Sequence, residues 1–149
     1  MRKIDARIAR DILASAHEAW SNGALERMLG HYVDNLTYWC NVGAIDGQPF
    51  TIEGKQGLRT LLRSVLAVTE SATSIETFRF EAGVADASIA AHVRHRRTGH
   101  EMSGVYRQVV TFRGRKILRC DEHHDAERMS AFWRMVTIEG GEAGDGQDA

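Results

Sequence analysis

The residue best placed for chemistry is Glu122, in an alternating stretch near the C-terminal end of the chain. Strand alternation over residues 115–125 divides the side chains into two sets. These are Leu118, Cys120, Glu122 and His124 on one face, and Ile117, Arg119, Asp121 and His123 on the other. We place the first set inward, because it runs from apolar and soft residues to ionisable ones, as from the floor of a pocket to its mouth. A carboxylate on an apolar wall is desolvated, which raises its pKa and makes Glu122 a candidate general acid or base.

Residues 100–113, which precede this stretch, add hydrogen-bonding groups. Their more apolar set is placed inward and comprises Met102, Gly104, Tyr106, Gln108, Val110 and Phe112. Tyr106, Tyr38 and His124 are candidate donors to a developing oxyanion, and Gln108 is a candidate ligand contact. An alternative stays open at this point: Glu122 faces solvent or pairs with Arg119 or Arg107.

The chain has seven histidines, which raises the question of a metal site. His92 and His95 fall on opposite faces of one strand, as do His123 and His124 on another, and neither cluster has zinc-site spacing. The sequence therefore predicts no metal, and it carries no cofactor motif. His95 is instead a candidate single pocket residue that titrates near neutral pH. Trp20 and Cys40 complete the predicted ligand contacts, Cys40 as a small buried thiol.

Hydrophobic periodicity predicts the elements that must position these residues. Helical spacing appears over residues 4–20, 25–32 and 58–66, and again after Asp125, which can cap a last helix. Strands are predicted at 36–41, 74–81, 84–97, 100–113 and 115–125, while 43–54 is predicted to be a loop. Helices ahead of a run of strands joined by short glycine turns predict an α+β domain, with helices packed on one face of a curved antiparallel sheet.

Composition restricts the protein class. The chain has 149 residues, of which 43% are hydrophobic and 26% charged, typical of one globular domain. We assign residues 1–136 to this domain and 137–149 to a flexible, acidic, glycine-rich tail. No apolar run is long enough to cross a membrane. Two cysteines without an export signal predict free thiols and a cytosolic location. A net charge of -1 and a basic run at 92–97 without aromatic residues argue against a nucleic-acid partner.

Several segments together resemble a known superfamily. Residues 19–29 resemble the joint between the first two helices of SnoaL-like proteins, and residues 31–38 resemble the entry into their first strand. Residues 115–117 and 122–125 resemble their last hairpin and strand. These proteins belong to the nuclear-transport-factor-2-like superfamily, which includes ketosteroid isomerases. The resemblance covers roughly residues 4–136, and it implies a cone of curved sheet with a deep apolar pocket, usually in a homodimer.

The resemblance also implies roles for individual residues. The SnoaL cyclase acid matches Glu122, whereas the ketosteroid isomerase base falls at or beside Cys40, which is no carboxylate. His95 is the candidate for the histidine of the SnoaL site. We therefore expect a small, mostly apolar carbonyl ligand and cofactor-independent isomerase or cyclase chemistry. A ligand-binding or assembly module without chemistry is the alternative, and epoxide or dehydratase chemistry lacks a carboxylate pair. A homodimer is expected through the outward sheet face, with Val105, Val109 and Ile117 beside Arg107 and Arg119.

Overall fold

The computed structural model describes the backbone of residues 3–148 and the side chains of residues 3–137. Three helices precede or interrupt the first strands: α1 (Ala6–Ser21), α2 (Leu25–Leu29) and α3 (Lys55–Val68). The fourth, α4 (Ala126–Asp148), ends the described chain. Asp5 caps α1, since its carboxylate accepts a hydrogen bond from the Ile8 amide at 2.8 Å. The helices thus follow the predicted order, and α4 starts directly after Asp125 as expected.

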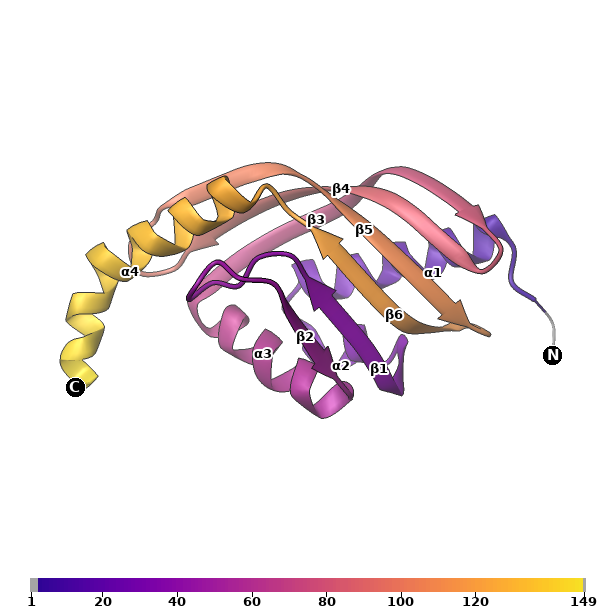
Figure 1. The fold of residues 1–149 in the computed structure, drawn as a ribbon, viewed down its shortest axis with the longest axis horizontal. Helices are drawn as coiled ribbons and strands as arrows, with labels where there is room; N and C mark the ends of the chain where they lie inside the picture. Colours follow the sequence, from indigo (N-terminus) through magenta and orange to yellow (C-terminus); the bar gives the residue numbers. More distant parts are fainter. Residues whose placement is uncertain (1–2, 149) are drawn as a thin grey trace.

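The six strands form one sheet in the order β2-β1-β6-β5-β4-β3. They are β1 (Tyr32–Cys40), β2 (Phe50–Glu53), β3 (Thr69–Glu81), β4 (Val84–His95), β5 (Glu101–Arg113) and β6 (Lys116–His123). Figure 1 shows the sheet curving over α1 and α3, which lie on one side of it. The α+β class and the curved sheet are therefore as predicted.

Two features of the sheet differ from the prediction. Residues 50–53, predicted as loop, form β2, which pairs antiparallel with β1 through four residues. The pairing of β1 with β6 is parallel, because the chain passes through β2, α3 and three more strands before β6 returns beside β1. A four-residue strand next to the only proline leaves little alternation to recognise. Parallel pairing between distant strands leaves no local sequence signal.

The core lies between the sheet and the helices. Its largest fully buried residues come from α1, α2, α3 and the strands, and they include Leu13, Leu29, Leu36, Leu58, Ile89 and Ile117. Ile117 was predicted to face outward, and this is wrong, since it is fully buried. The register between β5 and β6 shifts between Thr111 and Phe112, so that one extra residue of β6 turns Ile117 to the core side.

Three further predictions from the sequence concern the C-terminal tail, membrane-spanning helices and the two cysteines. The backbone of α4 continues as helix to Asp148, although the side chains of residues 138–148 lie outside the described part. The flexibility of the predicted 137–149 tail, and the boundary at residue 136, therefore stay predictions. Within the described residues, no helix has the length and hydropathy required to cross a bilayer. Cys40 and Cys120 are both free and buried.

Candidate functional site

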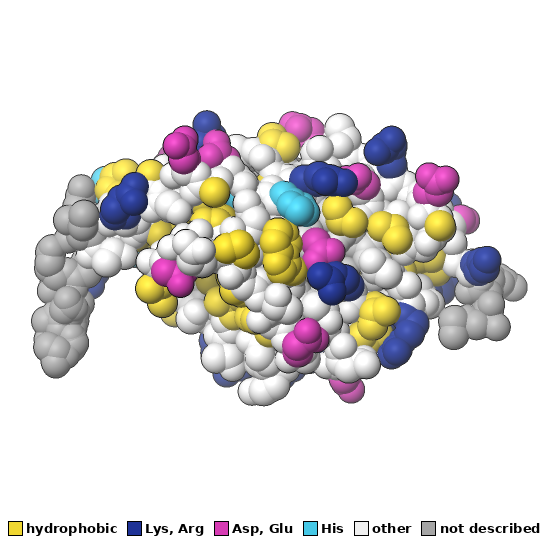
Figure 2. Space-filling view, viewed as in Figure 1, with side chains coloured by type: hydrophobic (Ala, Val, Ile, Leu, Met, Phe, Trp, Pro, Cys, Tyr) yellow, Lys and Arg dark blue, Asp and Glu magenta, His cyan; other side chains and the backbone are white. Residues whose placement is uncertain are grey.

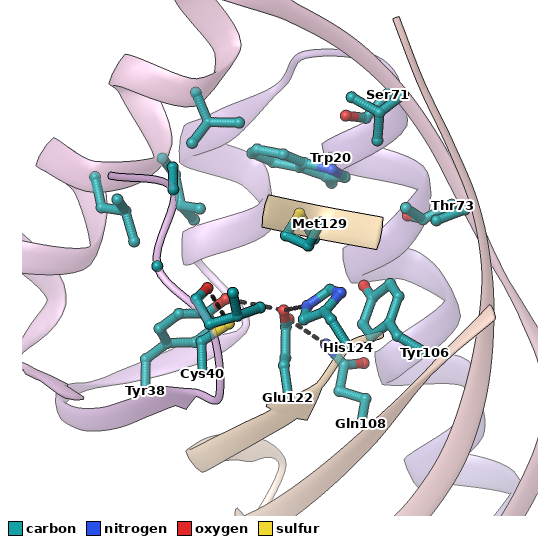
Figure 3. Close-up of a pocket in the computed structure, with 18 of the residues that line it drawn as sticks. Trp20, Tyr38, Cys40, Ser71, Thr73, Tyr106, Gln108, Glu122, His124 and Met129 are labelled. Carbon is teal, nitrogen blue, oxygen red and sulfur yellow. Dashed lines mark hydrogen bonds and ion pairs between the residues drawn. The ribbon is translucent and has the colours of Figure 1, made fainter. Parts of the chain in front are cut away.

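A cavity of about 900 Å³ opens between the inner face of the sheet, α1, α3 and the start of α4. Its wall is mostly apolar, with a small set of polar groups drawn in Figure 3. A mostly apolar cavity of this size with a few converging polar groups is typical of small-molecule sites. The sheet forms one wall because alternate residues of β1, β4, β5 and β6 face the helices.

Seven of the eight predicted site residues line this cavity: Trp20, Tyr38, Cys40, Tyr106, Gln108, Glu122 and His124. The inward assignment of the β5 set is therefore correct at Tyr106 and Gln108. The inward assignment of the β6 set is correct from Cys120 onward. The open alternative for Glu122 does not hold, because Arg119 pairs with Asp121 and Arg107 with Asp86.

The assignment of His95 to the pocket is wrong. His95 ends β4 on the inward face, two residues beyond Val93, which does line the cavity. There its Nδ1 lies 3.1 Å from the Thr98 hydroxyl, inside the turn that leads to β5. The turn packs against the end of α3, because the amide of Arg96 donates to the carbonyl of Val68. His95 is therefore buried between the turn and α3 and does not line the cavity. Strand alternation predicts the face of a residue and not how far the pocket extends along that face.

Glu122 and His124 form a largely buried ion pair in the wall of the cavity. The Nε2 atom of His124 lies 2.9 Å from Oε1 of Glu122, and their side chains are 14% and 13% exposed. Tyr38 donates to the same Oε1 at 2.8 Å, and the Gln108 amide donates to Oε2 at 2.9 Å. Glu122 therefore accepts three short hydrogen bonds, from β1, β5 and the residue that follows β6, and a long one of 4.0 Å from the Cys120 thiol.

Asn41 fixes the backbone of His124. The Asn41 carbonyl oxygen accepts from the His124 amide at 2.8 Å, and its amide nitrogen donates to the His124 carbonyl at 3.0 Å. Since His124 lies just beyond the end of β6, no ladder partner would otherwise hold it. The two bonds hold its ring over the cavity.

The predicted rise in the pKa of Glu122 is wrong. Burial does push this pKa upward, but the hydrogen bond and positive charge of His124 oppose it, together with the hydrogen bonds from Tyr38 and Gln108. The net result is a pKa below the ordinary value for Glu122. For His124, burial lowers the pKa, yet its contacts with Cys40 and Glu122 outweigh burial and raise the pKa to about 9. At neutral pH the pair is thus a carboxylate and an imidazolium.

Tyr106 lies flat against His124. The ring centroids are 4.2 Å apart with an interplanar angle of 25°, a stack that favours a charged imidazole. Burial raises the pKa of Tyr106, so that its hydroxyl stays protonated. Among the described residues this hydroxyl has no hydrogen-bond partner, whereas the Tyr38 hydroxyl is already bound to Glu122. Of the three predicted oxyanion donors, Tyr106 and His124 are therefore the two with capacity for a ligand.

His17 of α1 belongs to the same network, although the sequence did not single it out. Its Nε2 donates to the Gln108 carbonyl oxygen at 2.9 Å, and its Nδ1 accepts from the Thr73 hydroxyl at 2.7 Å. A carbonyl oxygen can only accept, which assigns the tautomer. Burial lowers the pKa of His17 and keeps the ring neutral. Helical spacing could have identified His17 as an inward residue, because it follows the buried Leu13 by four residues and so lies on the same face of α1.

One group of side chains in the described part has donor atoms close enough for a metal ion. The sulfur of Cys40 and one atom each from Glu122 and His124 lie within 4.8 Å of one another. Cys40 and Glu122 are direct neighbours across β1 and β6, which explains the proximity. Thiolate, carboxylate and imidazole are ligands that zinc accepts. Here Glu122 and His124 bind each other, and the absence of a metal from this site stays a prediction.

Comparison with known proteins supports the fold. No family model and no curated protein matches the chain. Solved structures match throughout most of their length. A protein of Xanthomonas campestris pv. campestris named as a candidate polyketide cyclase has a TM-score of 0.75 and 14% identity, covering 86% of this chain and 98% of that one.

Two further structures are similar. An NTF2-like protein of unknown function from Burkholderia pseudomallei has a TM-score of 0.72 and 14% identity, covering 82% of this chain and 94% of that one. An LEH-like epoxide hydrolase of M. tuberculosis has a TM-score of 0.70 and 13% identity, covering 89% and 96%. Identities this low show the fold without the activity. The resemblance found in the sequence is thereby confirmed at the level of the fold: this chain has the nuclear-transport-factor-2-like fold.

Proposed function

We propose that the protein binds a small, mostly apolar carbonyl compound in this cavity and catalyses proton transfer at the carbon next to the carbonyl. The observation that carries the proposal is the largely buried pair of Glu122 and His124 in the wall of a mostly apolar cavity. A carboxylate and an imidazolium side by side supply a base and a hydrogen-bond donor for one substrate. The similar structures include a candidate polyketide cyclase, which suits carbonyl chemistry.

Each group has a distinct role in the proposed step. Oε2 of Glu122 accepts one short hydrogen bond, from Gln108, and a long one of 4.0 Å from the Cys120 thiol, so it is the less strongly bound carboxylate oxygen and the one assigned to take a proton from carbon. The electron pair of the broken C–H bond becomes an enolate, whose oxygen receives hydrogen bonds from His124 and Tyr106. Return of the proton from Glu122 to the same or another carbon completes an exchange or an isomerisation, and no oxidant or cofactor is consumed.

Deuterium exchange tests this function without knowledge of the natural substrate. With 4-(4-methylphenyl)cyclohexanone in D₂O, we expect the wild-type protein to accelerate exchange next to the carbonyl, followed by proton NMR. Glu122→Gln is expected to lose roughly a hundredfold or more of this rate, as for removal of a general base. Asp121→Asn is the matched control, because Asp121 is the neighbour in β6 that faces outward and pairs with Arg119.

A second candidate is a binding module without turnover. The observation in its favour is that three hydrogen bonds already satisfy Glu122 and lower its pKa, which weakens it as a base. A ketone that binds with no acceleration of exchange in the wild-type protein would support this candidate and contradict the catalytic one.

We also propose that the protein forms a homodimer through the outer face of the sheet. Val105 of β5 is 54% exposed and also touches the cavity, and strand alternation places it with Arg107, which pairs with Asp86, on the outer face. Figure 2 shows hydrophobic side chains interspersed with charged ones over this face. Light scattering at micromolar concentration is expected to give twice the chain mass of 16.6 kDa, and a strictly monomeric mass would contradict the proposal. The two buried free thiols support a reducing, cytosolic setting for this dimer.

A further inference from the structure

The cavity has a second group of polar atoms, where α1 meets β3 and apart from Glu122. Trp20 of α1 and Ser71 of β3 both line the cavity and are half-buried. Figure 3 shows the two side chains on the wall beyond Met129, on the far side of it from Glu122 and His124. Among the described residues, neither the indole N–H of Trp20 nor the hydroxyl of Ser71 has a hydrogen-bond partner. Half-buried polar groups that face a cavity without a hydrogen-bond partner in the protein are suited to bind a ligand.

Thr73 holds these two residues in place. The Ser21 hydroxyl donates to the Thr73 carbonyl at 3.2 Å and accepts from the Thr73 amide at 2.9 Å. His17, one turn earlier in α1, binds the Thr73 side chain. Trp20 lies between these two anchors, and Ser71 lies two residues before Thr73 on the same face of β3. The pair is therefore a preorganised feature of the cavity wall.

The sheet register gives the separation of the two polar ends. Ser71 pairs with Val93 and Tyr106 pairs with Ile89, so that Ser71 and Tyr106 are two strands and four residues apart. At ordinary strand spacings their Cα atoms are separated by roughly 16 Å. The long side chains of Tyr106 and Trp20 shorten this span. The remaining space suits a ligand of two or three rings.

The charged residues of the cavity wall lie elsewhere. Asp46 belongs to the loop before β2, Glu122 to β6, His124 and Asp125 to the link before α4, and Arg128 to the first turns of α4. The lining residues of α1 and β3 are uncharged, since burial lowers the pKa of His17 and keeps it neutral. The indole N–H of Trp20 can only donate. A neutral oxygen is thus the group that matches this end.

We propose that Trp20 and Ser71 form a second recognition point, which binds a neutral oxygen at the far end of an elongated, mostly apolar ligand. The inference rests on the proposed function for the near end, where His124 and Tyr106 receive the carbonyl. The ligand class is accordingly a rigid compound of two or three rings with an oxygen at each end.

Matched probes test this inference. 4-(4-Hydroxyphenyl)cyclohexanone and 4-(4-methylphenyl)cyclohexanone differ only by a hydroxyl in place of a methyl group, at the end opposite the ketone. Calorimetric titration of the wild-type protein is expected to give about fivefold tighter binding of the hydroxyl compound, as for one net neutral hydrogen bond. Trp20→Phe and Ser71→Ala should each reduce this preference while binding of the methyl compound persists. Ser74→Ala, an exposed serine of the same strand, is the control and should keep the preference.

The outcomes separate the two proposals. If both probes bind the wild-type protein equally, or if the preference survives in Trp20→Phe and in Ser71→Ala, the second recognition point is refuted and the proposed function stands. If neither probe binds, both proposals fail together. The indole N–H resonance of Trp20 gives an independent readout, because only the hydroxyl compound should move it downfield.

Discussion

The free energy of unfolding of the wild-type protein is expected to fall by about 3 kcal/mol as the pH rises from 6.5 to 9. The cause is His124, whose pKa rises from 6.5 to about 9 in the folded state. A group with a raised folded pKa contributes its full stabilisation below the unfolded value, and this is lost as the pH rises through the folded value. Urea unfolding at several pH values measures the slope.

A control isolates His124 from other groups that titrate in this range. In Glu122→Gln the carboxylate beside His124 is gone and only the Cys40 contact still raises the pKa of His124, so the slope between pH 6.5 and 9 should become clearly smaller. Burial raises the pKa values of Cys120 and the three tyrosines, so they add a loss of stability only above their ordinary values of 9.0 and 10.0. The lowered pKa values of His17, His31 and His95 have the opposite effect near pH 6.5, and they act in both proteins. Equal slopes in wild-type and Glu122→Gln protein would mean that the ion pair does not control stability here.

His17→Leu is expected to destabilise the protein by roughly 2–4 kcal/mol. The substitution leaves the Gln108 carbonyl oxygen and the Thr73 hydroxyl without their partner in a buried place. The Gln108 amide is then held by Glu122 alone, which weakens the hydrogen bond that supports the carboxylate. A rise in the pKa of Glu122 should accompany the loss of stability, because the Gln108 hydrogen bond lowers this pKa.

The pKa readout distinguishes positioning from packing alone. His17→Gln keeps a side-chain N–H that can donate to Gln108, and it should recover part of both effects. A His17→Leu protein as stable as the wild type, with an unchanged Glu122 pKa, would show that His17 does not organise the site. Urea unfolding and NMR titration provide the two measurements.

Local patterns in the sequence predicted the elements with strong periodicity. The leucines of α3 recur at helical spacing, and β4 and β5 alternate over a dozen residues between short glycine turns. The same alternation identified the inward faces that carry Tyr106, Gln108 and Glu122. It failed at Ile117, where the register shift reverses the face, and at β2, which is too short to show a period.

The electrostatics of the site depended on neighbours that no local pattern reveals. Desolvation of Glu122 was predicted, and it occurs, but Tyr38 comes from 84 residues away and Gln108 from 14 residues away. Their hydrogen bonds, with the charge of His124, reverse the sign of the pKa shift. A low pKa at Glu122 therefore marks a buried ion pair, and not the solvated surface group that a low value would suggest from the sequence alone.

The pKa of His124 is the measurement that tests the central claim most directly, by NMR titration of its imidazole in wild-type and Glu122→Gln protein. The ion pair predicts a wild-type pKa of about 9, with a clear fall in the variant, where burial lowers this pKa and only the Cys40 contact still raises it. A wild-type His124 that titrates near 6.5 and does not respond to Glu122→Gln would contradict the pair. The proposed proton-transfer site would then lose its charged donor.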